Sequence, residues 1–72
     1  MFYTRLRELR LARNLTAKTM AEFLGMVYRN YQRYETGEVD PPLSKAIALA
    51  DYFDVSLDFL TGRNDNPNSH KL

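Results

Sequence analysis

The chain has 72 residues, with ten basic and nine acidic side chains, a net charge of +1 and no cysteine. This length suits one small domain near the lower limit for folding around a single hydrophobic core, and the absence of cysteine excludes a disulfide framework or a thiolate zinc site. The chain begins with MFYTRLRELR, which lacks the apolar run of a signal peptide, and no later stretch is apolar enough to span a bilayer. These features predict a cytoplasmic location and no membrane partner.

The charge is unevenly distributed along the chain. Residues 1–33 carry seven basic and two acidic side chains, whereas residues 34–72 carry three basic and seven acidic ones. A basic half can face phosphate groups while the acidic half stays in solvent, although such asymmetry also arises by chance in short chains. The distribution is therefore only a weak indication of nucleic-acid binding.

The first predicted helix covers residues 4–13. Leu6 and Leu9 lie three residues apart on one face, with arginines at positions 5, 7 and 10 around them. Asn14 follows and suits the end of a helix. We therefore expect a short amphipathic helix at the start of the domain.

The second predicted helix begins at Thr16, whose side-chain oxygen can accept a hydrogen bond from a free amide of the first turn. Three apolar residues then follow at helical spacing and define its buried face: Met20, Ala21 and Leu24. Gly25 ends this helix, because glycine adopts a positive φ without steric cost.

The third predicted helix runs from Tyr28 to Thr36 and ends at Gly37. Tyr31 and Tyr34 point inward, and the outward face carries Tyr28, Arg29, Gln32 and Arg33. Two short helices joined by a tight turn that contains glycine form a helix-turn-helix, the second helix of which enters the major groove of DNA.

A loop follows at residues 38–42, where two consecutive prolines prevent the helix from continuing. Beyond it, hydrophobic spacing predicts a helix that starts at Leu43 or Ser44 and ends at Phe53. The side chains expected on its buried face are Ala46, Ile47, Leu49, Ala50 and Phe53.

Ser56 can cap a last helix, from Leu57 to Thr61, which Gly62 ends. We expect residues 1–63 to form the domain. Residues 64–72 are polar and rich in asparagine, which is typical of a flexible tail or a linker stub.

The pattern predicts an all-α fold with five helices, since no strand-like alternation occurs. Several short motifs also follow one another at distinctive spacings: RLRELR at residues 5–10, LT at 15–16, MAEFLG at 20–25, RYETG at 33–37, and PPL with ALADYFDVSLDFLTGR within 41–63. In this order the chain resembles the lambda-repressor-like (Cro/CI, xenobiotic-response-element) helix-turn-helix family, over roughly residues 4–63. The resemblance implies a compact five-helix DNA-binding domain whose helices 2 and 3 form the helix-turn-helix.

The resemblance implies that base-reading side chains lie on the exposed face of the third helix. Arg29 and Arg33 lie four residues apart and therefore project from one face. Arginine can bond guanine, glutamine can bond adenine, and tyrosine can pack on a thymine methyl group or bond a phosphate. The candidate base contacts are Tyr28, Arg29, Gln32 and Arg33, although an ordinary solvated polar face would look similar.

Phosphate contacts are expected at two places. The amino end of the second helix presents free amides and a positive dipole end, and the turn after the third helix offers backbone groups. The candidate phosphate contacts are Thr16, Ala17, Lys18, Asn30, Thr36 and Gly37.

The family pattern also implies two structural contacts. Arg10 is expected to form an internal ion pair with Glu35, which would join the first helix to the third. Tyr52 and Phe59 are candidates for a dimer interface, with the alternative that Phe59 simply completes the core. A dimer would bind an inverted repeat with half-sites about one helical turn apart.

Four residues depart from the family pattern. Ala17 stands where many relatives carry a phosphate-clamping glutamine, and Val27 stands where they carry a capping serine or threonine, with a loss of about 1 kcal/mol. Glu38 and Asp40 make acidic a loop that is often basic. These departures predict weaker non-specific DNA binding than is usual.

No pattern indicates catalysis. His70 is the single histidine and lies in the polar tail, and Asp51, Asp54 and Asp58 lie near helix ends, where capping and solubility explain them. We expect no enzyme activity, no metal, no cofactor and no small-molecule substrate.

The sequence therefore favours a sequence-specific regulator of transcription, a repressor that binds a double-stranded DNA operator as a homodimer and occludes a promoter. The alternative is a protein-interaction module on the same fold that has weak or lost DNA binding. An antitoxin, which binds both operator and toxin, lies between the two.

Overall fold

The computed structural model of the chain describes residues 2–63 and residue 66. Its five α-helices are α1 (Phe2–Ala12), α2 (Ala17–Leu24), α3 (Tyr28–Thr36), α4 (Leu43–Phe53) and α5 (Leu57–Leu60). The part of the chain that the structure describes contains no strand, so the predicted all-α, five-helix fold is confirmed. The tail predicted at residues 64–72, with His70, lies outside the described residues apart from Asn66.

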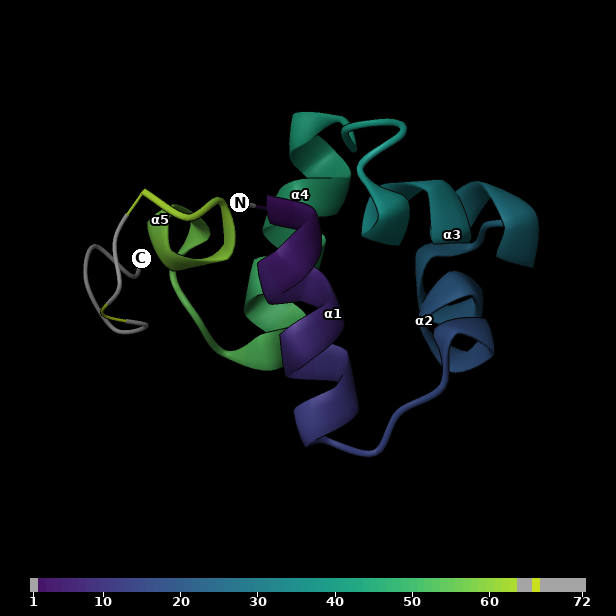
Figure 1. Cartoon of the computed structure of the whole chain (residues 1–72), viewed down its shortest axis with the longest axis horizontal. Helices are drawn as coiled ribbons and strands as arrows, with labels where there is room; N and C mark the ends of the chain where they lie inside the picture. Colours follow the sequence, from purple (N-terminus) through teal and green to yellow (C-terminus); the bar gives the residue numbers. More distant parts are fainter. Residues whose placement is uncertain (1, 64–65, 67–72) are drawn as a thin grey trace.

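Helix α1 lies at the centre of the arrangement. Figure 1 shows α2 and α3 on one side of α1 and α5 on the other, with α4 alongside α1. Contacts join α2 to α3, α1 to α3, α4 to α5 and α1 to α5. The helix-turn-helix pair is therefore attached to the rest of the fold largely through α1.

One core unites all five helices. Its largest fully buried side chains come from every helix: Leu6, Met20, Tyr31, Leu49, Phe53 and Leu60. Ala46 and Ala50 add to the buried face of α4. Ile47, which the spacing predicts to be buried, is instead 43% exposed. It follows Ala46 by about 100° around the helix, which turns it away from the core.

Helix boundaries follow the expected caps, with small differences. The side chain of Thr16 accepts from the Thr19 amide at 3.0 Å, and Ser56 accepts from the Phe59 amide at 3.0 Å. Val27 makes no capping bond with its side chain at the start of α3. Helix α1 begins at Phe2 rather than at residue 4, because Phe2 packs against the core one turn before Leu6. Helix α5 ends at Leu60, one residue earlier than expected.

Two arginines, one in α1 and one just after it, tie the C-terminal helices to this part of the chain. The guanidinium of Arg5 lies 4.2 Å from the centre of the Phe59 ring and donates to the Phe59 carbonyl at 3.2 Å. Arg13 donates to the Phe53 carbonyl at 2.6 Å, at the end of α4. None of the helices in residues 2–63 is long and apolar enough to cross a membrane.

Gly25 and Gly37, which end α2 and α3, both adopt left-handed backbone conformations, with φ of 68° and 81°. Their surroundings differ. A Cβ atom at Gly25 would meet nothing within 4 Å, whereas at Gly37 it would lie 2.8 Å from Cδ1 of Tyr3. Only glycine therefore allows the Tyr3 ring to approach the end of α3 this closely.

Gly37→Ala is expected to destabilise the domain more than Gly25→Ala. Both changes introduce left-handed strain of about 1–2 kcal/mol, but only the change at Gly37 also displaces the Tyr3 ring. Chemical denaturation of both variants measures the two losses. Equal losses would show that the Tyr3 ring moves aside at no cost.

Candidate nucleic-acid interface

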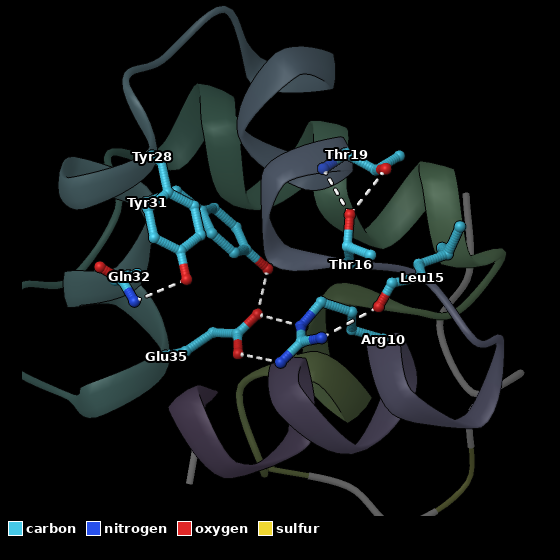
Figure 2. Close-up of polar contacts among 8 residues, drawn as sticks. All are labelled: Arg10, Leu15, Thr16, Thr19, Tyr28, Tyr31, Gln32 and Glu35. Atoms are coloured by element: carbon cyan, nitrogen blue, oxygen red, sulfur yellow. Dashed lines mark hydrogen bonds and ion pairs between the residues drawn. The ribbon is translucent and has the colours of Figure 1, made fainter.

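A partly buried polar network fixes α3 against α1 (Figure 2). Arg10 donates to Glu35 through Nε at 2.7 Å and through Nη2 at 2.9 Å. Tyr31 donates from its hydroxyl to the same carboxylate at 2.5 Å, and Arg10 also donates to the Leu15 carbonyl at 2.9 Å. The Arg10 and Glu35 side chains are only 13% and 9% exposed. The network thus holds α1, the segment before α2, and α3 in one arrangement.

The network also affects protonation. The hydrogen bond to Glu35 raises the pKa of Arg10, against an opposing effect of burial. Burial raises the pKa of the Tyr31 hydroxyl well above its ordinary value, and its hydrogen bond to Glu35 adds to the shift. Both groups therefore keep their protons at neutral pH and remain donors to the carboxylate.

The four candidate base-reading side chains project from the outer face of α3, and two of them, Tyr28 and Gln32, border the network at Glu35. All of them are exposed, while Tyr31 and Tyr34 are buried on the inner face. The Gln32 amide nitrogen donates to the Tyr28 hydroxyl at 2.8 Å, as Figure 2 shows. This hydrogen bond restricts the conformations of both exposed side chains.

The acidic loop reaches this face as well. Glu38 forms an ion pair with Arg33, with Oε2 lying 3.3 Å from Nε. Both side chains line the same surface hollow, whose lining is Arg29, Gln32, Arg33, Thr36 and Glu38. A carboxylate thus lies among the candidate base-reading groups.

The candidate phosphate contacts lie at the start of α2, on the flank of α3 and at the end of α3. Thr16, Lys18 and Gly37 are exposed, and Thr16 is bonded to both the amide and the hydroxyl of Thr19. Asn30 lies on the other flank of α3, in a hollow that it shares with Met26, Arg33, Tyr34 and Val39.

A third hollow brings Ala17 and Thr36 together with the base-reading face. Its lining is Arg7, Arg10, Ala17, Tyr28, Gln32, Glu35 and Thr36. Arg7 is exposed and was not among the predicted contacts. The signal was present in the sequence, since Arg7 precedes Arg10 by three residues and so shares its face of α1.

The two candidate dimer residues have different surroundings. Phe59 is partly buried, packs against the core and is covered by Arg5. Tyr52 is 36% exposed, and its ring centre lies 4.5 Å from that of Phe23, which is 46% exposed. Phe59 thus helps to complete the core, and the exposed aromatic pair is Phe23 with Tyr52.

Tyr31→Phe is expected to change how stability depends on pH. Above about pH 10 an unfolded tyrosine loses its proton while Tyr31 in the folded chain keeps it, so alkali stabilises the unfolded chain. The stability present at lower pH is therefore lost as pH rises, at up to about 1.4 kcal/mol per pH unit, and Tyr31→Phe removes that contribution. Denaturation of both proteins from neutral to strongly alkaline pH measures the difference. Parallel profiles would contradict the assignment.

Comparison with known proteins also finds helix-turn-helix proteins. A family model described as Helix-turn-helix matches residues 6–60. The chain is 42% identical over 67 residues to the uncharacterized HTH-type transcriptional regulator YobD of Bacillus subtilis, covering 93% of this chain and 60% of that protein. No solved structure matches at a comparable level of significance.

Two further relatives have more specific names. The transcriptional repressor RstR of the cryptic phage CTXphi in Vibrio cholerae is 37% identical over 59 residues, covering 82% of this chain and 53% of that protein. The HTH-type transcriptional regulator AnsR of Bacillus subtilis is 41% identical over 59 residues, covering 82% of this chain and 51% of that protein. The chain spans between 51% and 60% of the length of these three relatives. It belongs to the XRE-type helix-turn-helix family.

Proposed function

We propose that this chain is a sequence-specific DNA-binding domain of a transcriptional regulator, and that α3 reads an operator from the major groove. The observation that carries the proposal is the exposed face of α3, where two arginines, a glutamine and a tyrosine project from a helix fixed by the Arg10–Glu35 pair. Relatives that carry the names of transcriptional regulators support it.

Each side chain has a partner that suits its chemistry. Arg29 and Arg33 can each donate two bonds to the O6 and N7 atoms of guanine. Gln32 donates one amide hydrogen to Tyr28, which leaves the other hydrogen and its oxygen for the N7 and N6 groups of adenine. The hydrogen bond to Tyr28 thus orients the amide for reading.

Phosphate binding would come from the elements on either side of α3. Lys18 is exposed in the first turn of α2, and Arg7 is exposed beside the hollow that contains Ala17 and Thr36. These groups attract the DNA backbone and fix the register of α3, without reading sequence themselves.

We further propose that the regulator represses transcription by occluding a promoter, as a homodimer on an inverted repeat. The name of one relative, a transcriptional repressor of a phage, supports the repression. Selection of bound sequences from a random duplex library by the purified chain tests the dimer: an enriched inverted repeat supports it, and an unrepeated short site contradicts it.

A second candidate function is binding of another protein. The exposed Phe23–Tyr52 pair favours it, because contiguous exposed aromatic surface often marks an interface. Failure to enrich any duplex, even at low salt, would favour this function over DNA binding.

Arg33→Ala is expected to weaken binding to the selected site by about 1–3 kcal/mol and to relax preference at one base pair. Arg63→Ala is the matched control, because it removes the same charge from an exposed position that follows α5, the helix that lies on the far side of α1 from α3 in Figure 1. Titration of both variants against the selected site and its single-base variants measures the effect. Equal losses in the two variants would contradict the contact.

Lys18→Ala is expected to act differently, because a phosphate contact carries no sequence information. It should weaken binding to all duplexes alike and reduce the slope of log affinity against log salt by about 1. Affinity measured over a range of salt concentrations checks this. An unchanged slope would remove Lys18 from the phosphate contacts.

A further inference from the structure

The acidic side chain of Glu38 lies at a surface where binding of the negatively charged DNA would favour basic residues. It lies in the hollow formed by the candidate base-reading residues, where a phosphate-binding surface would exclude a carboxylate. Asp40, two residues further along the same loop, is exposed and forms no ion pair within the described part of the chain. The two acids of this loop therefore differ in what they contact.

The backbone holds Glu38 over the last turn of α3. Gly37 turns the chain through its left-handed conformation, and the Val39 amide then donates back to the Arg33 carbonyl at 3.3 Å. The Glu38 amide donates to the Thr36 hydroxyl at 3.4 Å. These bonds place the carboxylate beside Arg33, which reduces the entropy lost when the exposed ion pair forms.

The atoms that meet determine what the pair can do. Glu38 contacts Nε of Arg33, on one edge of the guanidinium. The guanidinium has five N–H donors in a planar fork, so a carboxylate at Nε leaves the two Nη groups at the tip free. Two parallel donors are what the O6 and N7 atoms of guanine accept.

We propose that Glu38 is a positioning residue that fixes Arg33 for guanine and at the same time lowers affinity for other duplexes. The carboxylate holds the guanidinium plane in one orientation, so that the Arg33 side chain loses less conformational entropy when it binds guanine. Its negative charge also repels phosphates wherever Arg33 lacks its guanine partner. Specificity therefore increases while overall affinity falls. This inference rests on the proposed function.

The test compares Glu38→Gln with Asp40→Asn. Each change removes one negative charge from the same loop with almost no change in size, but only Glu38 contacts Arg33. Affinity is measured for the selected site, for the site with the base pair read by Arg33 replaced, and for a random duplex. Arg33→Ala identifies that base pair, as the one where preference is lost.

Both variants are expected to bind the random duplex more tightly than the wild type. Only Glu38→Gln is expected to lose preference at the base pair read by Arg33, by about two- to fivefold, the range of an exposed ion pair. In the Arg33→Ala background, Glu38→Gln should then change affinity for all duplexes alike, because its partner is gone.

Two results would overturn the proposal. If Glu38→Gln and Asp40→Asn both raise affinity and leave the preference at that base pair unchanged, Glu38 is only a surface charge, and the proposed function still holds. If the wild-type chain enriches no duplex at all, the proposed function fails first, and the role of Glu38 fails with it. The wild-type measurement alone separates these two cases.

Discussion

The rest of the structure depends on the ion pair between Arg10 and Glu35. Two charges removed from water are costly unless each is fully bonded, and here the carboxylate takes two bonds from the guanidinium and one from Tyr31. A third donor group of Arg10 bonds the Leu15 carbonyl. Because only one arrangement of α1, α3 and the segment before α2 satisfies all these bonds, the pair specifies the direction in which the outer face of α3 points. Specifying geometry in this way matters more than any net stability from the pair.

The fold could be predicted from the sequence because its local signals agree with its packing. Helix α3 has the boundaries expected from its amphipathic spacing and from Gly37, and the caps at Thr16 and Ser56 form as their residue types suggest. The failure at Ile47 has a clear origin. Small alanines interrupt the large apolar residues of α4, so periodicity alone does not show where the buried face ends. Ile47 lies beside that edge, and the prediction that it is buried is wrong.

The candidate interface was less predictable than the fold. Residue type and spacing are enough to gather polar side chains on one face of α3, and the resemblance was needed to expect the Arg10–Glu35 pair. Neither source indicates that Glu38 contacts Arg33, because these residues lie on either side of a glycine turn where helical spacing no longer applies. Contacts between exposed side chains depend on loop conformation and rotamer, which a linear pattern does not contain.

The two ends of α3 are held in different ways, and this difference bears on how strictly the side chains at each end would discriminate between bases. At its carboxyl end Gly37 packs under Tyr3, and the loop bonds back to Arg33. At its amino end Val27 provides no side-chain cap, and its carbonyl accepts only from the Asn30 and Tyr31 amides within the helix itself. The carboxyl end of α3 is thus held by other parts of the chain, whereas its amino end lacks a side-chain cap. We expect the bases opposite Arg33 to be read stringently and those opposite Tyr28 permissively, so that related operators would diverge from one side of each half-site first.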